Sequence, residues 1–177
     1  KALLSIIFSF LFVSQIFCQN FSDKIEDKQF PLPANCVRLE GNLDNYIKLS
    51  IENWNKGNLP YEEFVNFYRK GRPKFALGEM WGKAVRSGCM FYRYTSDPEL
   101  KKILDETVKD LLSTQRVNGS ISCVEIDKQP EGSELWERKY VMLGLQEYYQ
   151  WVNKDSNVLD ALKKQADNII ELIGHNP

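Results

Sequence analysis

The clearest pattern along the chain is a nearly all-apolar segment followed by a segment with one apolar face. In the first part of residues 77–115, hydrophobic or small residues lie on nearly every side of a helix, and the few charges fall along one stripe. This pattern predicts a helix that is buried on most sides. The second part predicts an amphipathic helix, because its apolar residues recur at three- and four-residue spacing: Leu100, Ile103, Leu104, Val108, Leu111 and Leu112. Together the two parts predict a helical hairpin.

The same pattern recurs further along the chain. From about Ser133, the stretch SELWERKYVMLGLQEYYQWV is again largely apolar, and an amphipathic helix ends before Gly174. Asp97 and Asp155 are predicted N-caps of the two amphipathic helices, and Pro98 suits a first helical position. Trp81 and Trp136 mark equivalent places in the two hairpins, which gives a repeat of roughly 55 to 58 residues.

The remaining segments predict smaller elements. Residues 44–56 carry one apolar face and predict a helix, and a short helix is expected from Pro60 to Gly71. Residues 20–42 predict an extended lead-in with no periodicity. Residues 121–126 alternate weakly, which leaves a short strand or an extended loop open.

Repeated inner and outer helices predict an all-α fold. Such repeats form either an open solenoid or a closed α/α toroid. The inner helices here lack outward charge, which favours the toroid. Two hairpins cannot close a ring, so residues 43–177 are expected to be the N-terminal part of a longer α/α-barrel domain.

Composition narrows the function classes. The net charge of −1 and the absence of a basic patch give no indication of nucleic-acid binding. Residues 1–19 predict a secretory signal peptide rather than a transmembrane span, because the apolar run is short and a polar segment follows. The protein is therefore expected to be secreted or periplasmic, and lipid attachment at Cys18 is the alternative.

Cleavage of that signal would leave Cys36, Cys89 and Cys123, and an odd number argues against a disulfide framework. No Cys or His pair has metal-ligand spacing, so no metal site is predicted in this chain. Cys89 is expected to pack as a small hydrophobe inside its helix. The sequence predicts no oligomeric state.

Three stretches carry a resemblance to a known family. In order, they are GEMWGKAVRSGCMFYRYTSDPELKKILDETVKDLLSTQRVNGSIS, LWERKYVMLGLQEYYQWV and ALKKQADNII. This series is similar to the N-terminal catalytic region of the β-L-arabinofuranosidase-like proteins of glycoside hydrolase family 127 and its relatives. The match covers about residues 41–174 and is a diffuse pattern.

The resemblance implies a secreted bacterial glycosidase with an (α/α)6 barrel, of which this chain holds an incomplete toroid, acting on arabinofuranosyl or related plant glycans. It also implies a Cys nucleophile in a zinc site of Cys and Glu ligands, with a Glu as acid/base. Those residues are expected beyond this chain, because Cys89 and Cys123 do not match the motif. Family members often have a sugar-binding His early in the second inner helix, where this chain has Tyr140.

The predicted contribution of this chain is a wall that grips an oligo- or polysaccharide substrate. A Trp face suits the apolar face of a sugar, while Arg and Lys donate to its hydroxyls. The candidates lie near the N-terminal ends of the two inner helices: Glu79, Trp81, Lys83, Arg86, Trp136, Arg138, Lys139 and Tyr140. No catalytic residue is predicted among them.

Each candidate also has a structural interpretation. Glu79 and Lys83 have the spacing of an intrahelical salt bridge. Arg138 and Lys139 suit a solvated helix end or pairing with Glu134 and Glu137, and large aromatics on apolar helices usually pack in the core. A non-catalytic α/α scaffold that binds carbohydrate or protein therefore stands beside the glycosidase hypothesis.

Overall fold

A computed structural model describes residues 29–71 and 78–174, which include the helices of the second of two compact units, Leu32–Pro177. The predicted signal peptide with Cys18 lies outside the described residues. The elements, in chain order, are α2 (Asn42–Ser50), the π-helix η1 (Ile51–Asn55), α3 (Tyr61–Lys70), α4 (Met80–Thr95), α5 (Pro98–Leu112), the short 3-10 helix η2 (Ile126–Lys128), α6 (Glu134–Trp151) and α7 (Ser156–Ile173). In these ranges every regular element is helical, which confirms the all-α prediction.

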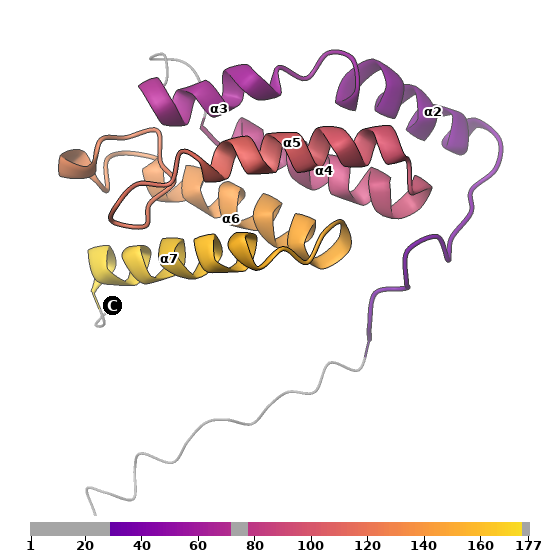
Figure 1. Ribbon diagram of the computed structural model, residues 1–177. Helices are drawn as coiled ribbons and strands as arrows, with labels where there is room; N and C mark the ends of the chain where they lie inside the picture. The colour runs from indigo at the N-terminus through magenta and orange to yellow at the C-terminus, as the bar shows by residue number, and fades with distance from the viewer. Residues whose placement is uncertain (1–28, 72–77, 175–177) are drawn as a thin grey trace, which may run out of the picture. The chain divides into compact units, whose positions relative to one another are not determined.

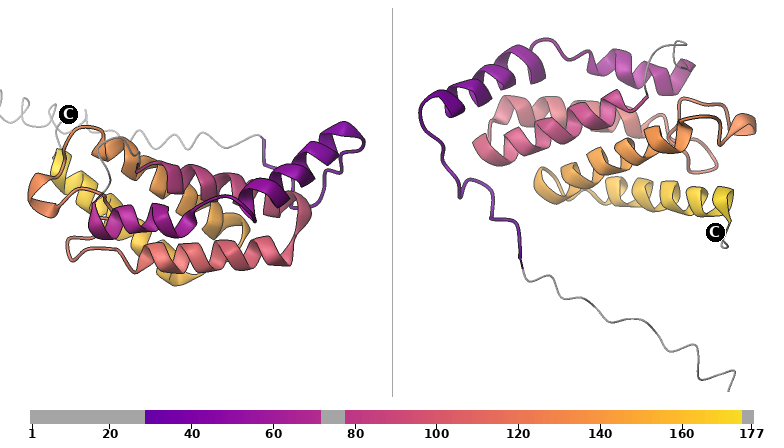
Figure 2. Two further views of the ribbon diagram at one scale, coloured as in Figure 1. Left: turned by 90° about the horizontal axis from the view of Figure 1, so that it is seen from above. Right: turned by 180° about the vertical axis from the view of Figure 1, so that it is seen from behind.

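The two predicted hairpins are present and lie side by side (Figure 1). Helices α4 and α6 form the most extensive packing of the unit and run in the same direction, while α5 and α7 return antiparallel to them. The views in Figure 2 show α2 and α3 end to end along one side, with α3 against α5. The arrangement is that of part of a helical-hairpin toroid.

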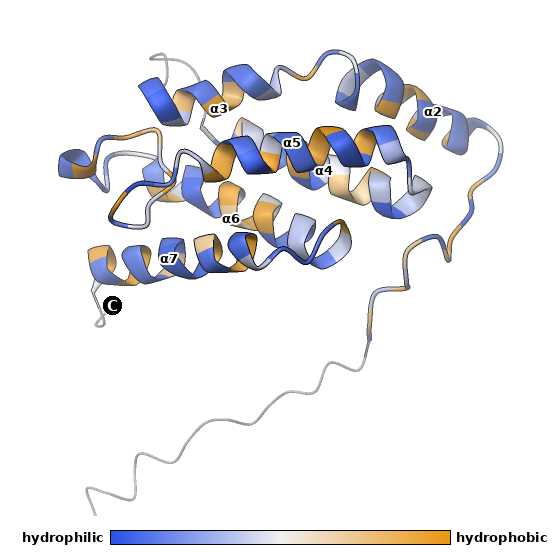
Figure 3. Ribbon diagram, viewed as in Figure 1, coloured by the Kyte–Doolittle hydropathy of each residue, from blue (hydrophilic) through white to orange (hydrophobic). Residues whose placement is uncertain are grey.

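The core forms where these helices meet. The apolar stripe of α5 points inward, because Leu100, Leu104 and Leu111 are all inaccessible to solvent. Figure 3 shows hydrophobic and hydrophilic residues alternating along α5 and α7, as expected of amphipathic outer helices. In the described residues no helix is long and apolar enough to cross a membrane.

The predicted caps close the hairpin turns. The Asp97 side chain accepts hydrogen bonds from the backbone N–H groups of Glu99 (2.8 Å) and Leu100 (3.1 Å), and Asp155 accepts from Asn157 (2.9 Å). The Lys56 ammonium, at the end of η1, lies 2.7 Å from the second Asp97 carboxylate oxygen. Asp97 therefore also links η1 to the start of α5.

Two glycines allow α4 and α6 to touch backbone to backbone. A Cβ atom at Gly82 would lie 2.1 Å from the backbone carbonyl oxygen of Tyr140. A Cβ atom at Gly144 would lie 3.0 Å from the carbonyl oxygen of Gly82. Any larger side chain at Gly82 would force the two inner helices apart.

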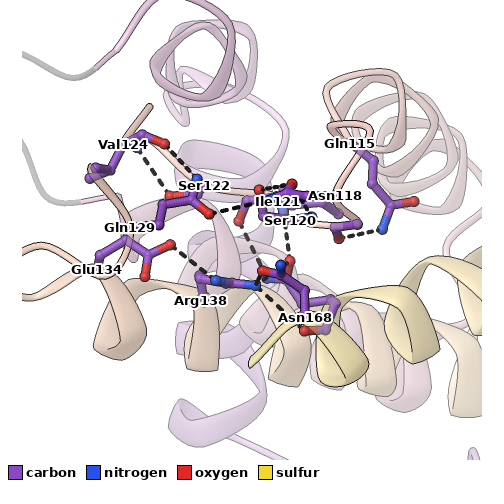
Figure 4. Close-up of polar contacts among 12 residues, drawn as sticks. Gln115, Asn118, Ser120, Ile121, Ser122, Val124, Gln129, Glu134, Arg138 and Asn168 are labelled. Atoms are coloured by element: carbon purple, nitrogen blue, oxygen red, sulfur yellow. Dashed lines mark hydrogen bonds and ion pairs between the residues drawn. The ribbon is translucent and has the colours of Figure 1, made fainter. Parts of the chain in front are cut away.

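The segment between α5 and α6 is a loop, without a strand at residues 121–126, and a buried polar network holds it (Figure 4). Gln165 of α7 accepts a hydrogen bond from the Ile121 N–H (2.6 Å) and donates to the Ile121 carbonyl (3.3 Å). Arg138 of α6 lies 3.3 Å from Glu134 and donates to Asn168 (2.6 Å). The loop is therefore fixed by side chains of the second hairpin.

We expect Gly82→Ala to lower the free energy of unfolding by about 1 to 3 kcal/mol, because the added methyl group meets the α6 backbone. Gly88→Ala on the same helix is the matched control. Its Cβ would lie 2.9 Å from a Leu104 methyl group and 3.4 Å from the Asn55 side-chain nitrogen, which are side-chain atoms that can shift, and the change gains helix propensity of about 1 kcal/mol. Urea unfolding followed by circular dichroism measures both. Equal stability of the two variants would contradict the close approach.

Gln165→Leu is expected to cost about 2 to 4 kcal/mol, because it leaves the buried N–H and carbonyl of Ile121 without their partner. Gln150→Leu, on the exposed surface of α6, is the control and should change stability little. Thermal or urea unfolding provides the measurement. A Gln165→Leu protein as stable as the control variant would show that the loop does not depend on this side chain.

Candidate functional site

The N-terminal ends of α4 and α6 bring five of the predicted site residues together. The Trp136 indole N–H donates to one oxygen of the Glu79 carboxylate, and the Lys83 ammonium donates to the other. The Trp136 and Tyr140 rings meet edge to face with their centroids 5.4 Å apart. Lys139 lies over both rings. We call these residues, Glu79, Lys83, Trp136, Lys139 and Tyr140, the ammonium–aromatic cluster.

The cluster combines a buried anion with an exposed indole, a half-buried phenol ring and exposed cations. Glu79 immediately precedes α4 and is only 6% exposed, whereas Trp136 is 51% exposed. The hydrogen bond to Glu79 raises the pKa of the Lys83 ammonium, so Lys83 carries a full charge at neutral pH. A ligand can therefore reach an aromatic surface and ammonium donors at the same place.

The cations lie close to the aromatic rings. The Lys139 ammonium is 3.3 Å from the Trp136 ring centroid and 4.5 Å from that of Tyr140, and the Lys83 ammonium is 4.7 Å from the Tyr140 centroid. These distances are within the range of cation–π attraction. The predicted salt bridge between Glu79 and Lys83 is present and lies inside the cluster.

Trp81 and Arg138 lie elsewhere. Trp81 is inaccessible to solvent in the core, and its indole N–H donates to the Thr107 hydroxyl at 2.9 Å. Arg138 is 1% exposed, and it pairs with Glu134 of its own helix, one of the pairings that the sequence left open. It also donates to Asn168 of α7 at 2.6 Å. Burial lowers the pKa of the Arg138 guanidinium, and the ion pair opposes that shift. Neither side chain reaches the exposed cluster.

Arg86 lies further along α4 and faces α6. Its Nε atom is 3.6 Å from a Glu147 carboxylate oxygen, and its side chain is 40% exposed. This contact links the two inner helices beyond the cluster. Arg86 thus lies on the side of α4 that faces α6, and its guanidinium is already paired with a carboxylate.

Sequence reasoning missed a buried polar group behind the cluster. The Tyr68 hydroxyl donates to the Gly78 carbonyl oxygen, and burial raises the pKa of this hydroxyl well above its usual value. A Cβ atom at Gly78 would lie 2.4 Å from the Glu137 carboxylate and 2.8 Å from the Cys123 sulfur. No pattern in the sequence connects α3, the loop and α6 here, because the contact depends on tertiary packing.

The described residues do not form a metal site. No group of three or more His, Cys, Asp or Glu side chains in residues 29–71 and 78–174 could hold a metal ion. Cys89 is fully buried in the core, and burial raises the pKa of its thiol, which disfavours the thiolate needed for metal binding or nucleophilic attack. The zinc implied by the family resemblance is therefore assigned to no residue here.

A hollow of about 680 Å³ lies at the other end of α4, beside residues 35–41. Its polar groups are largely paired with one another: the Tyr94 hydroxyl accepts from the Leu39 N–H and donates to Asp44, each at 3.0 Å. Asp44 also binds Lys48 at 2.6 Å. The Tyr94, Asp44 and Lys48 groups of this hollow are thus paired with one another, and Arg38 and Glu40 also line it.

Comparison with known proteins agrees with the architecture and with the resemblance seen in the sequence. No curated protein and no solved structure matches the chain significantly. A family model described as the catalytic domain of β-L-arabinofuranosidase, GH127, matches residues 31–176 and so covers most of the chain. The chain therefore belongs to the GH127 β-L-arabinofuranosidase family of glycoside hydrolases.

Proposed function

We propose that this chain forms the substrate-gripping wall of a secreted glycoside hydrolase that acts on arabinofuranosyl-containing plant-type glycans. The observation that carries the proposal is the exposed Trp136 ring, with the half-buried Tyr140 ring and the ammonium groups beside it, at the end where the inner helices begin. An aromatic ring packs on the C–H face of a sugar, and ammonium groups donate to its hydroxyls. Secretion is proposed from the apolar stretch in residues 1–19.

The catalytic groups are proposed to lie outside these 177 residues. A retaining glycosidase needs a nucleophile and an acid/base on opposite sides of the anomeric carbon. The buried carboxylates in the described part serve other contacts: Glu79 binds Lys83 and Trp136, and Glu134 pairs with Arg138. Any zinc that assists the reaction would likewise be held by other residues, since no ligand group forms here.

We expect Trp136→Ala in the full-length protein to raise the KM for an arabinofuranosyl oligosaccharide about fivefold with little change in kcat. The reason is the loss of an aromatic contact that contributes about 1 kcal/mol, at a distance from the breaking bond. Trp54→Ala is the matched control, because Trp54 is 54% exposed and lies on η1, away from the cluster. An unchanged KM in a stable Trp136→Ala protein would remove Trp136 from the site.

Residues 20–177 alone are expected to show no turnover of an aryl arabinofuranoside, while the full-length protein hydrolyses it. Circular dichroism of the shorter chain establishes that it is helical before the assay. Hydrolysis by residues 20–177 would overturn the placement of the catalytic groups. Glycan binding without hydrolysis by the full-length protein would instead favour the non-catalytic scaffold.

A further inference from the structure

The ammonium–aromatic cluster carries an excess of positive charge. Its one carboxylate, Glu79, is fully used, since Lys83 binds one oxygen and the Trp136 indole binds the other. Lys139 makes no ion pair in the part of the chain that the structure describes, and its only partners there are the Trp136 and Tyr140 rings. Lys83 is thus neutralised and Lys139 is not.

The position of Lys139 also determines what the Trp136 ring can bind. The ammonium lies 3.3 Å from the ring centroid, so it covers one face of the indole. A neutral sugar that packs on this face must displace the ammonium and lose the cation–π contact. A sugar with a carboxylate compensates for that loss, because the displaced ammonium gains a charged acceptor beside the ring.

We propose that the glycan gripped by this wall carries a uronic acid residue, whose carboxylate binds Lys139 while its C–H face packs on Trp136. This inference rests on the proposed function and specifies its substrate class as acidic, arabinose-bearing glycans. Both interacting groups are accessible, because Lys139 and Trp136 are exposed. Lys83 also lies 4.7 Å from the Tyr140 centroid, but Glu79 neutralises it, so Lys139 carries the net positive charge that attracts an acidic chain.

The proposal is tested with two substrates that differ only in charge. An arabinose-bearing pectic polysaccharide and the same polysaccharide after reduction of its carboxyl groups are assayed with the full-length protein for arabinose release. The acidic form should have a KM roughly ten- to a hundredfold lower, the range for a hydrogen bond to a charged group. Added salt should reduce the difference between the two KM values, because it screens charges at an exposed site.

Lys139→Gln should raise the KM for the acidic polysaccharide by a similar factor and raise the KM for the reduced form several-fold less, because only the acidic form presents a carboxylate to this side chain. Lys102→Gln on α5 is the control, because the Lys102 side chain is 75% exposed and pairs with Glu106 of its own helix. Equal KM values for the two polysaccharides, or an equal effect of Lys139→Gln on both, would overturn the inference.

The outcomes separate this inference from the function on which it rests. Hydrolysis of both polysaccharides with equal KM values would leave the glycoside hydrolase proposal intact and refute the acidic substrate class. Absence of hydrolysis of both polysaccharides and of an aryl arabinofuranoside would refute the proposed function and this inference together.

Discussion

The backbone contact between α4 and α6 is the constraint on which the rest of the structure depends. Gly82 leaves room for the Tyr140 carbonyl, and Gly144 leaves room for Gly82 itself. Since the helices are parallel, this contact aligns their first turns. Glu79 then meets Trp136, and further along the pair Arg86 meets Glu147. The exposed cluster is therefore a consequence of helix register, and the residues in it come from both inner helices.

The outer helices supply stability so that the inner helices can present polar groups at one end. Leu100, Leu104 and Leu111 of α5 bury the apolar side of α4, and Trp81 completes that interface with its bond to Thr107. Apolar burial of this kind contributes roughly 25 cal/mol per Å². An ion pair whose ammonium is exposed, such as Lys83 with the buried Glu79, contributes little by comparison.

Much of the fold follows from the sequence, because helix periodicity and capping residues act locally. The two hairpins and the caps at Asp97 and Asp155 were predictable for that reason. The direction in which each site side chain points could not be predicted from the sequence. Arg138 and Lys139 are neighbours in the chain, yet one is buried against α7 and the other is exposed, and only the position of the neighbouring helix decides between them. The contact of Tyr68 with Gly78, behind the cluster, depends on tertiary packing in the same way.

The loop held by Gln165 has a consequence for how this region folds. Ile121 is 44 residues from the side chain that satisfies its backbone, so the native hydrogen bonds of Ile121 form only when α7 is docked. Loop and α7 therefore form one cooperative unit, and the free energy of opening the loop includes that of releasing the helix. The α4–α5 hairpin has its own local caps and core, which makes it the natural place for structure to form first.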